Sequence, residues 1–332
     1  MPAPQNTAVT PMPTTQRFTW MDTMRGLAIV LVILRHGSTT LIEYQIFPTI
    51  WFQALQDVLV PFRMPALMLL SGLLLDRALK KNLGQYTLGK MQNLLWPYVI
   101  WAAIFLGVSN GGEQYLEPMA WVSTSYLWFI FFLMIYFAIA PFIKFLPAWV
   151  PVLAAWIGSW FEPYAASLLG QLLYFAGWFF LGQLASRHWD LVNRLLRPTP
   201  AIIAAVLAAF GAYFSLTYPA RIEYRVEIVP FAIAGIIAAI TLVRAIPDAR
   251  TGWIRFIGRT SLVWYVAHIP IMLVTRRILV MAGVENFWIH YIAGCTMAFL
   301  GSWVLARLFQ RGAPFSWLFK APWPKPKART TA

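Results

Sequence analysis

The chain has 332 residues, of which 60% are hydrophobic and only 11% are charged. A soluble domain carries about 25% charged residues, so this composition excludes a soluble enzyme and a disordered chain. The single cysteine, Cys295, excludes an intramolecular disulfide scaffold and a cysteine-rich zinc domain. A net charge of +14 could indicate nucleic-acid binding, but such binding needs a basic surface that is exposed to water. We therefore expect a membrane protein that binds no nucleic acid.

The two ends of the chain differ from the rest in composition. Residues 1–19 are rich in Pro, Thr and Gln and almost uncharged, which is typical of a flexible tail. They contain no apolar stretch with a small-residue cleavage site, so we expect no signal peptide to be removed. We divide the chain into this cytoplasmic tail, a membrane domain at 20–310, and a basic, proline-containing cytoplasmic tail at 311–332. The lysines of the last segment would contact membrane lipids.

Apolar runs recur along the membrane domain, and most are long enough to cross a hydrocarbon layer about 30 Å thick. They predict an all-α, polytopic transmembrane bundle of about ten helices. The predicted spans are 24–43, 51–75, 94–109, 123–143, 147–161, 167–186, 200–218, 226–243, 260–281 and 286–309.

The distribution of charge orients these spans. Cytoplasmic segments of membrane proteins are enriched in Lys and Arg, and most of the basic residues fall on one side if both termini lie inside. The outer ends then keep only Arg221, Arg225, Arg276 and Arg277, whereas acidic residues such as Glu162 lie outside. We therefore predict a multi-pass protein of the cell membrane with both termini in the cytoplasm.

Three charged side chains, Arg35, Asp57 and Arg63, lie within the first two predicted spans. A charge at the centre of a bilayer costs at least about 2.5–3.5 kcal/mol, and such residues usually line a cavity or pair with one another. The functional interpretation is a substrate path, in which Asp57 contacts substrate. The structural alternative is an ion pair of Asp57 with Arg63 or Arg35.

His36 is the more informative residue of the first span. It follows Arg25 by eleven residues, and eleven steps of about 100° return to nearly the same helix face about 16 Å further along. One face of the helix would therefore present a cation at the cytoplasmic edge and an imidazole deep in the membrane. A lone histidine is usually a hydrogen-bonded packing residue, but the alignment with Arg25 favours a functional role.

Arg63 lies at about the same predicted depth as His36, about 18 Å from the inner edge, on an antiparallel neighbour. The two side chains can therefore meet. A neutral imidazole can take the proton from an attacking hydroxyl, and a fixed cation can stabilise the oxyanion that develops. This combination suits acyl transfer.

The sequence resembles the acyltransferase-3 family of integral membrane O-acyltransferases, which modify envelope glycans and glycolipids. Five segments in the family's order carry this resemblance, and together they cover roughly residues 18–310. They are FTWMDTMRGLA at 18–28 followed by His36, RMPALMLLSG at 63–72, LLWPY at 94–98, YLWF at 126–129 and GRTSLVWYVAH at 258–268.

The resemblance implies an acyl-CoA donor from the cytoplasm, most simply acetyl-CoA, and an acceptor hydroxyl on an extracytoplasmic sugar, polysaccharide or glycolipid. A mycolate-type glycolipid is one acceptor of this class. Arg25 and His36 match the family's essential pair, and no metal is implied. The family often has two arginines before its third helix, where this chain has Lys90 and Asn93. Lys80, Lys81 and Lys90 could still serve as point-charge partners of the CoA phosphates.

Other polar and aromatic residues give weaker signals. Tyr265 and His268 share a helix face with Ser261, and they would either line the donor cavity or form interhelical hydrogen bonds. Tyr126 and Trp128 near the outer end of their span suit an aromatic belt, or alternatively stacking on an acceptor sugar. With Asp57 and Glu162, they are the candidate substrate-binding residues.

Two readings from other classes compete with the enzyme. A secondary transporter or flippase could use the buried Arg35, Asp57, Arg63 and His36, but it would be expected to show inverted repeats, which we do not find. A purely structural membrane partner leaves the alignment of Arg25 with His36 unexplained. Within the enzyme hypothesis, His36 either deprotonates the acceptor during direct transfer or carries the acyl group as an acyl-imidazole. We favour direct transfer.

Overall fold

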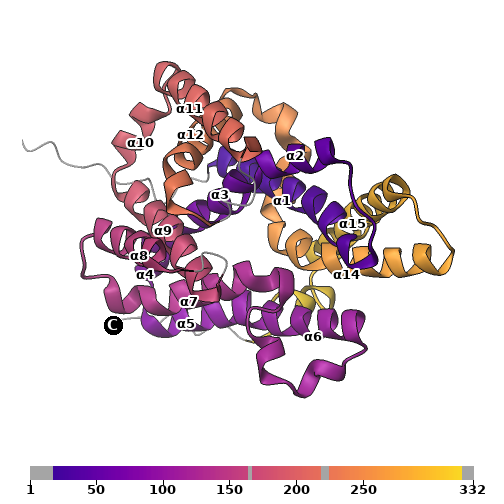
Figure 1. Ribbon diagram of the computed structural model, residues 1–332. Helices are drawn as coiled ribbons and strands as arrows, with labels where there is room; N and C mark the ends of the chain where they lie inside the picture. Colours follow the sequence, from indigo (N-terminus) through magenta and orange to yellow (C-terminus); the bar gives the residue numbers. More distant parts are fainter. Residues whose placement is uncertain (1–17, 164–166, 218–223, 324–332) are drawn as a thin grey trace, which may run out of the picture. The chain divides into compact units, whose positions relative to one another are not determined.

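In a computed structural model of the protein, the described residues are 18–163, 167–217 and 224–323. Over these ranges the chain folds into helices and turns, with no strand, which agrees with the predicted all-α class. The helices group into two compact units (Figure 1). Residues 1–17 of the predicted tail at 1–19, residues 324–332 of the predicted tail at 311–332, and the outer charges Arg221 and Glu223 lie outside the described residues.

The first unit comprises Met1–Met24, Val58–Lys80 and Phe142–Thr251. Within it, α9 packs against both α3 and α8, and α11 packs against α12. Its helices are α3 (Val60–Gly72), α4 (Leu75–Leu79), α8 (Trp149–Phe161), α9 (Leu168–Arg187), α10 (Trp189–Leu195), α11 (Pro198–Thr217) and α12 (Val229–Ala245).

Small residues allow the close approach of α3 and α9. A Cβ atom on Gly72 would collide with the carbonyl oxygen of Phe179, and one on Gly182 would collide with that of Leu69. Small residues commonly allow helices to pack closely in membrane bundles. The two backbones therefore touch at a point where no side chain fits.

The second unit comprises Arg25–Asp57, Lys81–Pro141 and Gly252–Ala332. Figure 1 shows α14 alongside α15, and α14 also packs against α6. Its helices are most of α1 (Thr19–Thr39), α2 (Ile50–Val58), α5 (Leu83–Lys90), α6 (Trp96–Asn110), α7 (Trp128–Ile143), α13 (Gly252–Arg259), α14 (Ser261–Met281) and α15 (Phe287–Arg311).

Within the described residues, seven helical segments are long and apolar enough to cross a membrane. The pair α10–α11, bent by 74° at its break, would make an eighth span. The seven segments are Ile50–Leu79, Leu83–Ser109, Ser125–Ile143, Leu168–Arg187, Val226–Ala245, Ser261–Met281 and Phe287–Arg311. Each overlaps one of the predicted spans, so the protein is a polytopic helical membrane protein.

The other three predicted spans differ from this set for physical reasons. The span 24–43 falls on α1, whose 21 residues include three charged side chains. The span 147–161 falls on α8, which has 13 residues and is only about 20 Å long at 1.5 Å per residue. The span 200–218 falls on the bent pair. The count of ten and the cytoplasmic position of both termini therefore stay predictions.

Candidate active site

His36 lies in the last turn of α1, within the second unit. Hydroxyl groups that follow it along the chain donate back to the helix. Ser38 Oγ donates to the carbonyl oxygen of Arg35 at 2.9 Å, and Thr40 Oγ1 donates to that of His36. These bonds satisfy carbonyls that a helix end otherwise leaves without an intrahelical donor. The His36 ring therefore projects from an ordered helix end.

Arg276 of α14 strengthens this helix end. Its side chain is completely buried, and Nη2 donates to the carbonyl oxygens of Gly37 at 2.9 Å and His36 at 3.3 Å. A cation at a helix C-terminus also interacts favourably with the helix dipole. Arg276 therefore fixes the backbone that carries His36.

The imidazole of His36 contacts a second histidine. His36 Nδ1 lies 3.0 Å from Nε2 of His268 in α14, and the ring centroids are 5.1 Å apart. His268 is completely buried, and its Nδ1 lies 3.1 Å from the carbonyl oxygen of Trp264. The two histidines, 232 residues apart in the sequence, thus form a hydrogen-bonded pair.

The partners of His268 determine which nitrogens carry protons. A carbonyl oxygen can only accept, so His268 Nδ1 must donate to Trp264. In the neutral form of His268, Nε2 is then an acceptor, and His36 Nδ1 must donate to it. In a neutral His36, Nε2 is then the nitrogen that carries no proton. The pair therefore sets His36 in the tautomer that a general base requires.

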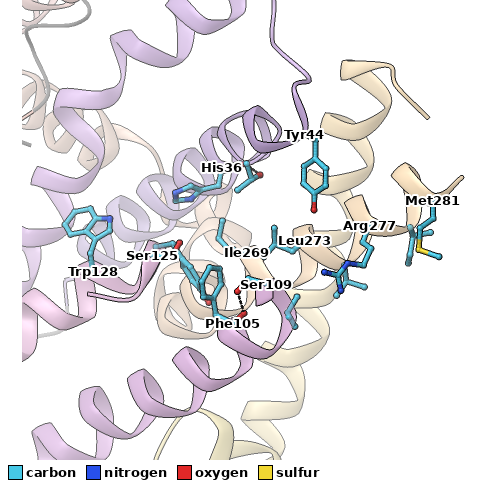
Figure 2. A pocket seen from close by; sticks show the side chains of 15 residues that line it. His36, Tyr44, Phe105, Ser109, Ser125, Trp128, Ile269, Leu273, Arg277 and Met281 are labelled. Atoms are coloured by element: carbon cyan, nitrogen blue, oxygen red, sulfur yellow. Dashed lines mark hydrogen bonds between the residues drawn. The ribbon is translucent and has the colours of Figure 1, made fainter. Parts of the chain in front are cut away.

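A cavity of about 640 Å³ opens beside His36 within the second unit. Figure 2 shows His36 and Trp128 toward one end of this cavity and Arg277 with Met281 toward the other. The volume is in the range of small-molecule sites. The other lining residues are Thr40, Tyr44, Phe105, Val108, Ser109, Ser125, Tyr126, Ile269, Leu273, Val274 and Ile278.

The segment before α7 carries Ser125 and Tyr126 to the cavity, and Trp128 at the start of α7 lines it as well. The segment is anchored by Tyr98 of α6, whose hydroxyl donates to the carbonyl oxygen of Trp121 at 2.6 Å. Ser125 has a φ of 41°, in a region that a non-glycine residue rarely occupies without local constraint. The anchored turn therefore holds these side chains at the cavity.

Tyr126 and Tyr265 were two of the weaker sequence candidates, and both contribute interhelical hydrogen bonds. The Tyr126 hydroxyl donates to the carbonyl oxygen of Val266 at 2.5 Å, and the Tyr265 hydroxyl donates to that of Tyr126. The Tyr126 ring also meets His268 edge to face, with centroids 5.4 Å apart. Tyr126 lines the cavity, whereas Tyr265 and His268 lie behind it.

Two of the charged residues of the first two predicted spans pair with each other. Arg35 Nη1 and Asp57 Oδ1 form an ion pair of 2.8 Å in the second unit, as one of the two structural alternatives expected. Neither residue lines the cavity. Arg63 is buried in α3 of the first unit, so its meeting with His36 stays a prediction.

The predicted partners of the CoA phosphates occupy different surroundings. Lys80 and Lys81 are exposed, whereas Lys90 is half-buried, with Nζ 3.0 Å from the ring centroid of Phe137. A cation over an aromatic ring is stabilised by the ring itself. Arg25 lies eleven residues before His36 on the same helix, α1. The roles of these residues toward CoA stay predictions.

Glu162 does not line the cavity. It follows α8 in the first unit, and its Oε1 accepts a hydrogen bond from Ser167 Oγ at 3.1 Å. Nor do the described residues contain a group of three or more His, Cys, Asp or Glu side chains placed to hold a metal ion.

Sequence reasoning missed Arg276, Arg277 and Ser125 as parts of the site. It counted the two arginines only as charges at the outer end of a span. A signal for Arg276 was present, because His268, Met272 and Arg276 follow one another at four-residue steps and share a helix face. All three are completely buried. No comparable pattern marked Ser125.

The described residues thus form a polytopic helical protein with a histidine pair beside a cavity. The family model described as "Acyltransferase domain" matches residues 18–307. The chain therefore belongs to the acyltransferase-3 family, as its sequence motifs indicated, and it is a membrane acyltransferase. No curated protein and no solved structure matches the chain.

Proposed function

We propose that the protein is an acyl-CoA-dependent O-acyltransferase. The donor is acetyl-CoA or another acyl-CoA from the cytoplasm, and the acceptor is a hydroxyl of an extracytoplasmic sugar, polysaccharide or glycolipid. The observation that supports this best is the His36–His268 hydrogen bond of 3.0 Å beside the cavity. It orients the imidazole of His36, which lines space that can hold an acceptor.

The reaction we propose has two proton transfers at one nitrogen. His36 Nε2 removes the proton of the acceptor hydroxyl as its oxygen attacks the thioester carbonyl. The tetrahedral oxyanion then collapses, the carbon–sulfur bond breaks, and the departing CoA sulfur receives the proton from Nε2. Throughout, His36 Nδ1 stays bonded to His268. Arg63 would stabilise the oxyanion, although its position beside His36 is itself part of the proposal.

Release of free CoA tests this function against the transporter alternative. Purified full-length protein in phospholipid nanodiscs is mixed with acetyl-CoA and an extract of envelope glycans and glycolipids. We expect acceptor-dependent release of free thiol, together with an acetyl ester on the acceptor by mass spectrometry. Intact acetyl-CoA and unmodified acceptors would contradict the proposal and favour a transporter that uses Arg35, Asp57, Arg63 and His36.

Arg25→Ala is expected to weaken the binding of a non-hydrolysable acetyl-CoA analogue about 10-fold to 100-fold, because a charge-assisted bond to a CoA phosphate is lost. Isothermal titration measures the effect. Arg311→Ala is the matched control, since it removes an exposed arginine from the end of α15 and should leave the affinity unchanged. Equal affinities of wild type and Arg25→Ala would assign Arg25 a structural role.

Direct transfer predicts that acetyl-CoA alone leaves no label on the protein. The motivating observation is that His36 already stands beside a cavity with room for an acceptor, so no second group need carry the acyl chain. Rapid quench with radiolabelled acetyl-CoA in the absence of acceptor is the measurement. A stoichiometric, hydroxylamine-labile label that disappears in His36→Ala would instead establish an acyl-imidazole intermediate.

A further inference from the structure

The walls of the His36 cavity carry an unusual combination of side chains for a site that would bind a neutral sugar. Among the described side chains that line it, the polar ones are His36, hydroxyl groups, the Trp128 indole and one arginine, Arg277, with no carboxylate or carboxamide. The rest of the lining is aliphatic or aromatic. The described part of the cavity lining therefore offers one cation and a large apolar wall, without the carboxylate that could accept hydrogen bonds from two adjacent sugar hydroxyls.

Arg277 stands at the end of the cavity away from His36 (Figure 2). It follows Ile269, the neighbour of His268, by eight residues on α14, which corresponds to a rise of about 12 Å. Among the described residues, no hydrogen bond or ion pair occupies its guanidinium group, and its side chain is exposed. A cation that lines a cavity without an anionic partner attracts an anion to that end.

The apolar wall continues from the cavity onto the outside of the second unit. Val274, Ile278 and Met281 of α14 line the cavity, yet they are 48%, 62% and 82% exposed, respectively. On a membrane-spanning helix, exposed apolar side chains of this kind face lipid. The cavity therefore meets the surrounding hydrocarbon beside Arg277, one turn from the end of α14.

Building on the proposed function, we propose that the acceptor is an anionic amphiphile: a hydroxyl-bearing headgroup with a phosphate or carboxylate and an attached alkyl chain. The hydroxyl reaches His36, the anion contacts Arg277 at the other end of the cavity, and the alkyl chain leaves past Ile278 and Met281 into the bilayer. Of the acceptor classes considered, this selects a charged glycolipid over a free polysaccharide.

The test measures binding, so it does not depend on catalysis. Full-length protein in phosphatidylcholine nanodiscs is treated with diethyl pyrocarbonate, and modification of His36 is followed by peptide mass spectrometry. Three probes compete: octyl glucoside 6-phosphate, uncharged octyl glucoside and glucose 6-phosphate. We expect the first to protect His36 at a concentration at least about 10-fold lower than either of the others, because only it uses both the cation and the apolar wall.

Variants of Arg277 distinguish the loss of its charge from a general disruption of the protein. Arg277→Gln should remove the preference for the phosphate, whereas Arg277→Lys should retain most of it. Arg225→Gln is the matched control, because Arg225 is an exposed arginine that pairs with Glu227 in the first unit, and the preference should persist there. An equal preference in wild type and Arg277→Gln, or none in wild type, would overturn the role of the anion.

The remaining outcomes distinguish a failure of this inference from a failure of the proposed acyltransferase function. If glucose 6-phosphate protects His36 as well as its octyl derivative does, the lipid part of the proposal is wrong. If acetyl transfer proceeds equally to charged and uncharged glycosides, the inference fails while the acyltransferase function stands. Preferential protection by the charged amphiphile without transfer to any hydroxyl would have the opposite meaning: the anionic site exists, and the proposed function is wrong.

Discussion

His36→Ala is expected to lower the rate of acyl transfer about 10²-fold to 10⁴-fold, which is the usual contribution of a general base. Among the described residues that line the cavity, His36 is the only histidine, and its Nδ1 is oriented by His268. Steady-state kinetics with acetyl-CoA and acceptor measures the loss. Affinity for a non-hydrolysable acetyl-CoA analogue should remain, because the substitution removes no charge that would bind phosphate.

The matched control for this variant is His188→Ala. His188 is an exposed histidine that follows α9 in the first unit, and its removal should leave transfer unchanged. Near-normal turnover of His36→Ala, in a preparation that still binds the CoA analogue, would remove His36 from the mechanism. The histidine pair would then be a packing feature of α1 and α14.

The second large effect is expected at His268, which acts on the reaction through His36. His268→Leu should lower kcat about 10²-fold, because His36 Nδ1 loses its acceptor and the imidazole is free to adopt the wrong tautomer. Loss of the charged carboxylate that orients a serine-protease histidine costs about 10⁴-fold, and a neutral partner should contribute less. Acyl-CoA affinity should be unaffected, so the effect appears in kcat.

His268→Gln distinguishes orientation from packing. Glutamine and leucine are similar in size, but only the amide oxygen can accept a hydrogen bond from His36 Nδ1. We therefore expect His268→Gln to recover a substantial part of the activity that His268→Leu loses. Equal activities of the two variants would mean that His268 supports the site only by filling space.

The sequence was sufficient to predict the class of the fold and the helix that carries His36. Runs of apolar residues predict transmembrane helices well because lipid leaves the backbone few alternatives. The span 147–161 stays a prediction, because the run is apolar but the helix α8 has only 13 residues. Hydropathy records which side chains lipid tolerates, and it does not record where a helix ends.

Contacts within the site were harder to predict than its elements. The His36–His268 pair joins residues 232 positions apart, and no local period in the sequence connects them. An ion pair of Asp57 was expected with either Arg63 or Arg35. The structure shows the pair with Arg35, at 2.8 Å. Arg277 was interpreted only as a charge at the outer end of a span, because its position on the helix does not show that a cavity lies beside it.

The most direct test of the account is acyl transfer across a sealed bilayer. Full-length protein is reconstituted into proteoliposomes, with radiolabelled acetyl-CoA on the face that carries Arg25 and a hydroxyl-bearing glycolipid in the opposite leaflet. The account predicts an acetyl ester on that glycolipid with wild-type protein, and its near-complete loss with His36→Ala. Equal labelling by wild type and His36→Ala, or acetyl-CoA that remains intact with both, would contradict it.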